Sequence, residues 1–337
     1  MITDREWIQR TLDHVDGDPV PYHFSFTMPA RRLAREHYGT PLEDALSMPV
    51  RRAKLNSLKP LHADPDEFGA AAKDDFGVVW ATSKLDRGVP VVPCLPEPDL
   101  SHYDFPDPAA PDRFAGLDDW CAAQEGHYRI IWVGDLWERA TFMRGMENLL
   151  TDAALRPAFV ESLLERIAAI VFETISILVE QCDFEAVALS DDYGAQNAML
   201  ISPADWRKLV KPHLARIYAL AKKHGRAVFH HSCGNIEPII GDMIDIGLDI
   251  LHPIQPEAMD ILRLKKDYGA HLTFCGGVPT QRLLTSATPE KVRSEVRRLK
   301  KEMGRGGGYI LEPGITIQAD VPLENLIAMI DEACLGS

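Results

Sequence analysis

The stretch Val228-Phe-His-His-Ser-Cys-Gly-Asn235 holds both the repeating unit of the fold and two reactive side chains. Residues 226–230 predict a short buried strand, which ends at Gly234-Asn235. His231 and Cys233 follow, one residue apart, so they point the same way if the strand pleat continues. An imidazole and a thiolate at one strand end are two ligands suited to zinc. The alternative is a capped strand end with a hydrogen-bonded histidine and a buried cysteine.

Outward from this stretch, short apolar strands alternate with amphipathic helices. The strands expected after residue 118 are 128–134, 184–190, 227–230, 248–252, 272–275 and 308–312. The helices expected with them are 148–181 (broken near Pro157), 202–223, 236–246, 258–268, 289–303 and 322–333. Such alternation with short connections predicts an α/β fold with a parallel sheet. The number of repeats favours a single (β/α)8 TIM-type barrel over residues 1–337, with an open doubly wound sheet as the alternative.

The first third of the chain is less regular. It predicts a helix over 3–12, opened by Thr3 and Glu6 as a capping box, and a strand over 19–26. Short helices are expected at 31–38 and 42–46. Residues 64–111, rich in proline toward their end and with a strand or hairpin at 74–80, predict an excursion covering one face of the barrel. This excursion either shapes a pocket or simply covers surface.

Composition and charge narrow the class of protein. The 337 residues are 46% hydrophobic and 26% charged, which is typical of a globular enzyme. The net charge of −14 argues against nucleic acid or an anionic membrane as partner. The six cysteines show no CxxC spacing and no signal peptide is evident, so we expect a cytoplasmic protein with reduced thiols. The apolar run 159–179 is interrupted by charged residues, which excludes a membrane span.

Functional groups of parallel α/β barrels stand at the carboxyl ends of the strands. Polar residues at the expected strand ends should therefore share one rim, although acidic residues there, Asp192 and Glu257 above all, could instead cap the following helix. The residues expected on this rim are Asp191, Asp192, Tyr193, His231, Cys233, His252, Gln255, Glu257, Cys275 and Glu312.

Several of these segments together resemble the uroporphyrinogen decarboxylase superfamily. They are residues 138–150, 231–236, 245–251, 255–260, 274–277, 306–314 and 321–325. The resemblance implies a distorted (β/α)8 barrel and one of two chemistries. One is cofactor-free decarboxylation of uroporphyrinogen, and the other is methyl transfer to or from a corrinoid or a thiol, with a zinc ion in the barrel.

Three features of the resemblance bear on the choice between decarboxylation and methyl transfer. The decarboxylases carry an arginine-rich motif near the N-terminus, which Thr27-Met-Pro-Ala-Arg-Arg-Leu33 does not match. The zinc methyltransferases carry His-x-Cys, here His231 and Cys233, although decarboxylases can show a similar pattern. The methyltransferases also place a cysteine after the last strand, where this chain has Ile315. A third zinc ligand is therefore expected from Cys275 or Glu312.

The sequence thus predicts transfer of a methyl group from a small O- or N-methyl compound to a corrinoid carried by a partner protein, or to a thiol. Asp191 or Asp192 would orient the substrate or relay a proton, and Tyr193 would hydrogen-bond a leaving oxygen. Further substrate contacts are expected from Arg139, Arg144, His252 and Gln255. Two alternatives are a metal-free decarboxylase, with Arg139 or Arg144 holding the carboxylate and Asp191 handling the proton, and a non-catalytic binding protein on the same barrel.

Overall fold

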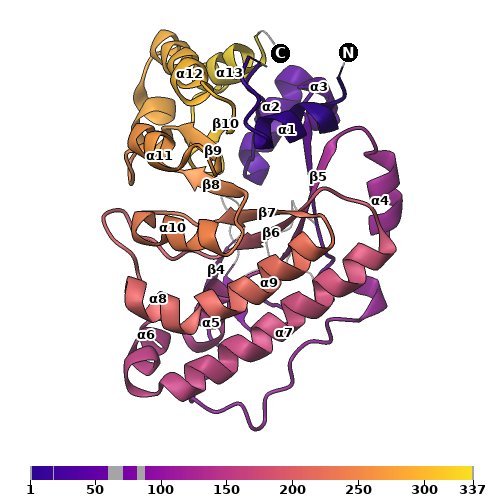
Figure 1. Cartoon of the computed structure of the whole chain (residues 1–337), viewed down its shortest axis with the longest axis vertical. Coiled ribbons are helices and arrows are strands. Elements are labelled where there is room, and N and C mark those ends of the chain that lie inside the picture. Colours follow the sequence, from indigo (N-terminus) through magenta and orange to yellow (C-terminus); the bar gives the residue numbers. More distant parts are fainter. Residues whose placement is uncertain (1, 18, 60–70, 82–87, 336–337) are drawn as a thin grey trace.

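A curled sheet of seven parallel strands forms the centre of the molecule (Figure 1). The computed structural model describes residues 2–17, 19–59, 71–81 and 88–335. In sheet order the strands are β1 (Val50–Lys54), β5 (Tyr128–Gly134), β6 (Ala186–Ser190), β7 (Ala227–His231), β8 (Ile250–Ile254), β9 (Thr273–Val278) and β10 (Tyr309–Pro313). Each neighbouring pair is parallel, so the predicted parallel α/β arrangement is confirmed.

The predicted strand at 19–26 supplies the eighth position of the barrel. Tyr22 and Phe26 form isolated parallel bridges with Leu311 and Ile317 beside β10. The Ile317 amide donates to the Ser25 carbonyl at 2.9 Å, which continues the same pairing. This segment therefore lies at one edge of the sheet and β1 at the other, as the predicted (β/α)8-type barrel requires.

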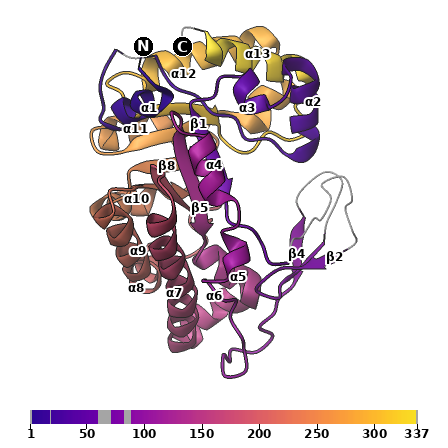
Figure 2. The same ribbon diagram turned by 90° about the vertical axis from the view of Figure 1, so that its right-hand side faces the viewer.

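Helices cover the outer face of the sheet (Figures 1 and 2). They are α5 (Trp137–Arg144), α6 (Met146–Leu155), α7 (Pro157–Gln181), α8 (Pro203–Leu209), α9 (Lys211–Lys223), α10 (Glu237–Asp245), α11 (Ile261–Tyr268), α12 (Pro289–Met303) and α13 (Leu323–Cys334). The predicted helix 202–223 is divided in two, because Pro212 cannot donate a backbone hydrogen bond and starts a new helix. None of the helices in the described ranges is both long and apolar enough to cross a membrane.

The strand β1 was not predicted. Its sequence, Val50-Arg-Arg-Ala-Lys54, carries three basic residues in five and lacks an apolar alternation. Arg51 is nevertheless only 5% exposed, because its guanidinium donates to Asp44 and to the carbonyl of Met48. Pairing of Arg51 with residues 44–48, beside the barrel, thus accommodates a basic residue in this strand.

A second core fills the inside of the barrel below its mouth. It consists of buried residues that include Val50, Ile130, Ala188, Phe229, Ile250, Cys275 and Ile310. Ile8 of the N-terminal helix α1 (Asp4–Leu12) belongs to the same cluster and is fully buried. Because α1 packs against the amino-terminal end of the barrel strands, a site open to substrate must lie at the opposite, carboxyl-terminal end.

The predicted excursion contains a small antiparallel sheet that projects beside the barrel (Figure 2). Its strands are β2 (Ala71–Lys73), β3 (Val79–Ala81) and β4 (Val89–Val92). Trp80 contacts Phe142 with ring centroids 5.0 Å apart, and Asp74 pairs with Arg139 at 2.9 Å, so this sheet packs on α5. Residues 64–70 and 82–87 of the excursion lie outside the described ranges.

The remaining elements are α2 (Met28–Tyr38), α3 (Leu42–Ala45), η1 (Pro111–Arg113), α4 (Leu117–Ala123) and η2 (Thr280–Leu284).

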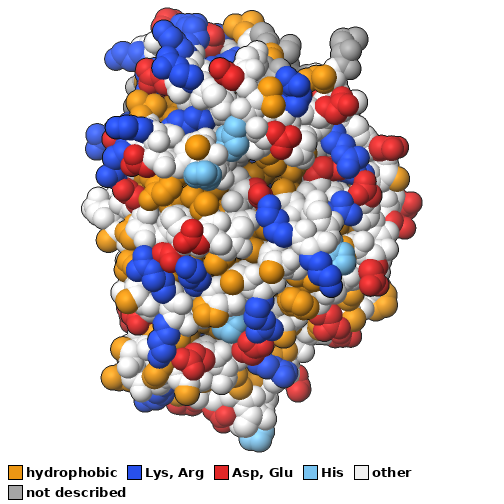
Figure 3. Space-filling model, in the orientation of Figure 1, with side chains coloured by type: hydrophobic (Ala, Val, Ile, Leu, Met, Phe, Trp, Pro, Cys, Tyr) orange, Lys and Arg blue, Asp and Glu red, His pale blue; other side chains and the backbone are white. Residues whose placement is uncertain are grey.

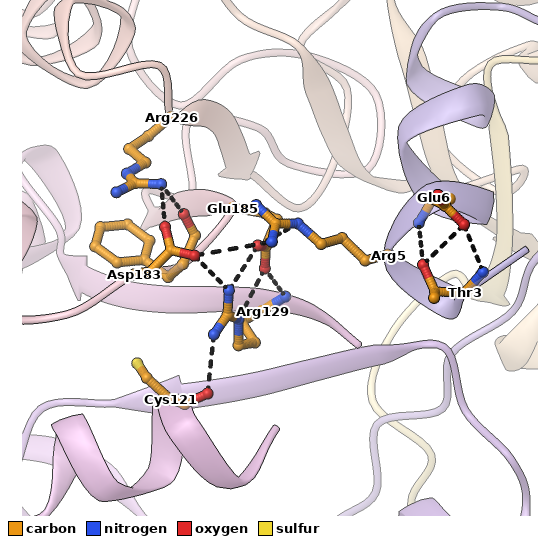
Figure 4. A network of polar contacts seen from close by, with 9 residues as sticks. Thr3, Arg5, Glu6, Cys121, Arg129, Asp183, Glu185 and Arg226 are labelled. Atoms are coloured by element: carbon orange, nitrogen blue, oxygen red, sulfur yellow. Dashed lines mark hydrogen bonds and ion pairs between the residues drawn. The ribbon is translucent and has the colours of Figure 1, made fainter. Parts of the chain in front are cut away.

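Figure 4 shows the ion-pair network at the amino-terminal end of β5, β6 and β7. Arg129 donates to Glu185 from its backbone amide, Nε and Nη2, at 2.7 to 3.0 Å. Arg5 of α1 pairs with the same carboxylate at 2.9 Å. Thr3 and Glu6 form the predicted capping box at the start of α1. The network therefore ties α1 to the base of the barrel. On the face shown in Figure 3, basic and acidic side chains are interspersed.

Replacing Glu185 by alanine is expected to lower the free energy of unfolding by about 3–5 kcal/mol, because it leaves the buried Arg129 guanidinium without its main partner. Denaturant unfolding followed by circular dichroism measures the change. The matched control is Glu165→Ala, which removes an exposed pair with Arg216 and should cost less than about 1 kcal/mol. Equal losses in the two variants would show that the network does not hold the barrel base.

Candidate functional site

Three polar side chains lie at one level of the barrel on adjacent strands. Ser190 of β6 is in register with His231 of β7, which is in register with His252 of β8. The Nδ1 atoms of His231 and His252 are 2.8 Å apart, within hydrogen-bonding distance. The carboxyl ends of neighbouring strands thus bring two of the predicted site residues into contact.

His231, Cys233 and Asp192 form the outer of two polar groups, which we call the mouth group. The Nε2 atom of His231 lies 3.4 Å from Sγ of Cys233 and 3.5 Å from Oδ1 of Asp192. The Cys233 amide donates to Asp192 at 2.8 Å. The side chains of His231 and Asp192 are 20% and 36% exposed, so the group is open to solvent.

Asp192 carries its negative charge in this setting. Burial by itself would raise the pKa of the carboxyl, but the neighbouring His231 ring and the hydrogen bond from the Cys233 amide outweigh burial and lower the pKa below its usual value. The mouth group therefore presents a carboxylate, an imidazole nitrogen and a thiol sulfur on one side of the barrel opening.

His252, Cys275 and Glu312 form the second group, which lies beneath the first and which we call the deep group. The Cys275 thiol donates to Glu312 at 3.1 Å, and Nε2 of His252 is 3.5 Å from the same carboxylate. Arg52 of β1 donates to both Glu312 oxygens, at 2.7 and 2.9 Å. Cys275 is 0% and Glu312 1% exposed, so solvent does not reach this group.

The charges of the deep group are fixed by burial and by Arg52. Burial opposes ionisation of Glu312, but the Arg52 guanidinium, with His23 and His252, holds the pKa of that carboxyl well below its usual range. Burial and the Glu312 charge raise the pKa of the Cys275 thiol well above its ordinary value. Burial lowers the pKa of His252 to about 3. The group thus holds a neutral thiol, a neutral imidazole and a paired carboxylate.

Either group could be considered for a metal ion, because the ligand atoms within each lie within 4.8 Å of one another. In a tetrahedral zinc site with bonds of about 2.0–2.3 Å, neighbouring ligand atoms lie about 3.4–3.6 Å apart. The separations from Nε2 of His231 in the mouth group, 3.4 and 3.5 Å, fit this spacing. A dication in the deep group would instead have to compete with the Arg52 guanidinium, which occupies both oxygens of Glu312. The predicted ligands Cys275 and Glu312 therefore belong to a different group from His231 and Cys233. In the mouth group the third possible ligand is Asp192.

Asp191 and Tyr193 face away from the mouth. Asp191 is fully buried and accepts hydrogen bonds from the amides of Leu136 and Glu138 at 2.8 and 2.9 Å, and from the Tyr193 hydroxyl at 2.9 Å. Burial, assisted by Asp135, raises its pKa to about 8. Asp191 therefore caps the start of α5, and the predicted catalytic roles of Asp191 and Tyr193 do not fit their positions.

The arginines predicted to hold substrate are committed to other partners. Arg139 pairs with Asp74 and Asp135, at 2.9 and 3.1 Å. Arg144 is buried and donates to Asp152 at 2.7 Å and to two carbonyls of the excursion. These guanidiniums fasten the excursion and α6 to α5, which leaves them unavailable to a substrate carboxylate.

Gln255 supports the loop that carries Cys233 rather than lining the opening. It is buried, and its side-chain oxygen accepts from the Gly234 amide. A Cβ atom on Gly234 would lie 2.4 Å from the backbone of Gly194, and the φ of Gly234 is +79°. The loops after β6 and β7 can therefore pass this closely only with glycine at the crossing.

Three residues around the two polar groups were not predicted. Ser190 donates to Glu138 at 3.2 Å, and the rule that places function at strand ends could have identified it. The centroid of the Trp132 ring lies 6.2 Å from that of the His231 ring, so Trp132 is an aromatic neighbour of the mouth group. Arg52 was missed because its strand was not predicted.

Comparison with known proteins identifies relatives of two kinds. The family model described as "Uroporphyrinogen decarboxylase (URO-D)" matches residues 133–334, more than half of the chain. A uroporphyrinogen decarboxylase of Thermus thermophilus is 32% identical over 139 residues, which are 39% of this chain and 37% of the relative. The methylcobamide:CoM methyltransferase MtaA of Methanosarcina barkeri is 25% identical over 146 residues, 43% of this chain and 40% of the relative. The chain thus spans about two fifths of the length of these curated relatives.

Among solved structures, a methyltransferase from Methanosarcina mazei has the same fold. It superposes with a TM-score of 0.74 at 17% sequence identity, covering 99% of this chain and 98% of that one. The likeness extends over the whole barrel and supports the predicted fold class.

Asp191→Ala is expected to lower the free energy of unfolding by about 1–3 kcal/mol, because two amides and the Tyr193 hydroxyl lose their acceptor. Asp191→Asn keeps an acceptor oxygen and should remain within about 1 kcal/mol of the parent. Chemical unfolding of both variants is the measurement. If the asparagine variant were as unstable as the alanine variant, the charge of Asp191, and not its capping role, would be what matters.

Proposed function

This chain belongs to the uroporphyrinogen decarboxylase (URO-D) family, and we propose that it is a zinc-dependent methyltransferase. In this proposal a methyl group moves from a small O- or N-methyl compound to a corrinoid protein or to a thiol. The observation that carries the proposal is the convergence of His231 Nε2, Cys233 Sγ and Asp192 Oδ1 at the open end of the barrel.

The chemistry of the mouth group suits zinc. An imidazole nitrogen, a thiolate sulfur and a carboxylate oxygen are all accepted zinc ligands, and three protein ligands leave the fourth position of a catalytic site open. The two anionic ligands, Cys233 and Asp192, would offset the charge of the dication. Zinc bound here would supply a Lewis acid that polarises the substrate heteroatom or lowers the pKa of a thiol.

The surrounding residues would orient the methyl donor. Trp132 offers an apolar ring beside His231, suited to a methyl group or a small aromatic ether. Ser190 lies in register with His231, and its hydroxyl is positioned by Glu138. On substrate binding the Ser190 hydroxyl would turn its proton from Glu138 to the leaving oxygen or nitrogen. The sequence suggested Tyr193 for the contact with a leaving oxygen.

The similarity to a methylcobamide:CoM methyltransferase supports a corrinoid as one reactant. The corrinoid would be carried by a separate protein that docks at the open end of the barrel, where the mouth group is partly exposed. Docking there would bring the reactive face of the corrinoid to the same side of the barrel as the methyl donor.

The second candidate is a metal-independent decarboxylase, favoured by the 32% identity to uroporphyrinogen decarboxylases. That chemistry needs fixed guanidiniums for substrate carboxylates. Arg52, Arg139 and Arg144 are each paired with carboxylates of the chain itself. These commitments favour methyl transfer over decarboxylation.

Zinc content tests the ligand set. The parent protein, purified under reducing conditions with zinc supplied, is expected to hold one zinc ion per chain, and His231→Ala, Cys233→Ser and Asp192→Asn are expected to lose it. The control is Cys275→Ser in the deep group, which should keep its zinc. Elemental analysis measures the content. A metal-free parent would contradict the proposal, and loss of zinc in Cys275→Ser alone would move the site to the deep group.

Turnover tests the reaction. With a reduced corrinoid and a panel of methyl ethers and methylamines, the parent is expected to form methylcorrinoid, which is followed by absorbance. Cys233→Ser should lower the rate by at least about 100-fold. Loss of a residue that only supports a metal ligand costs about 10–100-fold, and loss of the ligand itself should cost at least as much. Release of carbon dioxide from carboxylated substrates by chelator-treated protein would favour the decarboxylase. Ligand binding without turnover or zinc would favour a non-catalytic binding protein.

A further inference from the structure

We infer that His252 and Glu312 are positioning residues that fix the tautomer of His231, so that its Nε2 lone pair faces Cys233 and Asp192. The inference rests on the proposed metal-binding role of the mouth group. It gives the deep group a function, because Glu312 contacts His252 and His252 contacts His231 of the mouth group.

The contact between the two histidines allows only two arrangements when both rings are neutral. Their Nδ1 atoms are 2.8 Å apart, so one nitrogen must carry a proton and the other must accept it. If His231 donates, its Nε2 carries a lone pair and can bind a metal. If His252 donates, Nε2 of His231 carries the proton instead, and metal binding is blocked.

Glu312 favours the first arrangement. An ionised carboxylate only accepts hydrogen bonds, and Glu312 Oε2 lies 3.5 Å from Nε2 of His252. A proton on this Nε2 meets the negative charge, whereas a lone pair there would be repelled by it. His252 is 7% exposed, and burial favours a neutral ring with one proton. With that proton on Nε2, Nδ1 of His252 becomes the acceptor for His231.

Asp192 favours the opposite arrangement, because it lies 3.5 Å from Nε2 of His231. The two carboxylates differ in their surroundings. The Asp192 side chain is 36% exposed, while the Glu312 side chain is 1% exposed. Solvent screens the charge of Asp192 more strongly than that of Glu312. The buried carboxylate therefore determines the direction of the hydrogen bonds.

Glu312 is itself held in place from several sides. Arg52 donates to both of its oxygens, Ser25 donates at 2.7 Å and His23 lies 3.1 Å away. The carboxylate can neither rotate freely nor lose its charge easily. Arg52 thus orients Glu312, Glu312 orients His252, and His252 orients His231. Supporting partners of this kind typically change metal affinity by about 10–100-fold.

The tautomer of His231 can be measured in the metal-free protein by 15N NMR of the histidine side chains at pH 8. The parent is expected to show His231 protonated at Nδ1. In Glu312→Gln the side-chain amide can donate to His252, which should reverse both tautomers and place the proton of His231 on Nε2. A parent with His231 protonated at Nε2, or an unchanged tautomer in a folded Glu312→Gln variant, would overturn the inference.

Zinc affinity gives a second readout, which covers the case that Glu312→Gln fails to fold. His252→Leu removes the acceptor and should weaken zinc binding by about 10–100-fold, measured by competition with a chromophoric chelator. His252→Gln keeps a side-chain oxygen and should recover part of the loss. The control is His230→Gln, on the opposite face of β7 and bonded to Tyr218, which should bind zinc as the parent does. Unchanged affinity in His252→Leu would overturn the inference.

These measurements separate the inference from the proposed function. The tautomer is observed without metal, and zinc affinity is observed without turnover. A protein with the expected tautomer and affinities that transfers no methyl group would overturn only the proposed reaction. Methyl transfer that continues at the parent rate and zinc affinity in His252→Leu would overturn only the inference.

Discussion

The ion pair between Arg52 and Glu312 closes the barrel. Arg52 lies on β1 and Glu312 on β10, the two edge strands of the seven-stranded sheet, so the pair spans the seam of the barrel. Ser25, from the segment in the eighth position, donates to the same carboxylate and accepts from Arg52. A buried pair of this kind gains little net stability over apolar packing, but loss of either partner leaves a buried charge. Closure of the barrel therefore depends on correct pairing of Arg52 with Glu312.

The same interaction determines what the two polar groups can do. Glu312 is committed to Arg52, which makes the deep group unsuitable for a dication and leaves its carboxylate to orient His252. His252 contacts His231, whose side chain is the more exposed of the two. The barrel thus separates a dry supporting layer from an exposed reactive layer. The hydrogen bond between the imidazoles of His231 and His252 connects the two layers.

The sequence predicted the alternation of strands and helices, the barrel and the pair His231 and Cys233, because these depend on local periodicity and strand-end spacing. It did not predict β1, whose basic residues are buried only through partners distant in the chain. It favoured capping for Asp192 and chemistry for Asp191, whereas Asp191 caps α5 and Asp192 lies beside His231. Neighbouring residues after a strand turn to opposite sides, and the sequence does not show which side each one takes. Cys275 and Glu312 were expected beside Cys233, but depth within the barrel depends on register, which the sequence alone does not reveal.

The replacement of the methyltransferase cysteine by Ile315 also has a physical explanation. The zinc ligand set that the resemblance implies combines a histidine with thiolates, so the loss of a thiolate would remove one negative charge from such a site. Asp192 provides one carboxylate charge beside His231 and Cys233, from the loop after β6 instead of the loop after β10. In the proposed ligand set the net charge would be retained, while sulfur would be exchanged for a harder oxygen. A harder ligand donates less electron density than a thiolate, so bound zinc would be a stronger Lewis acid. That change suits activation of an ether or amine donor better than activation of a thiol.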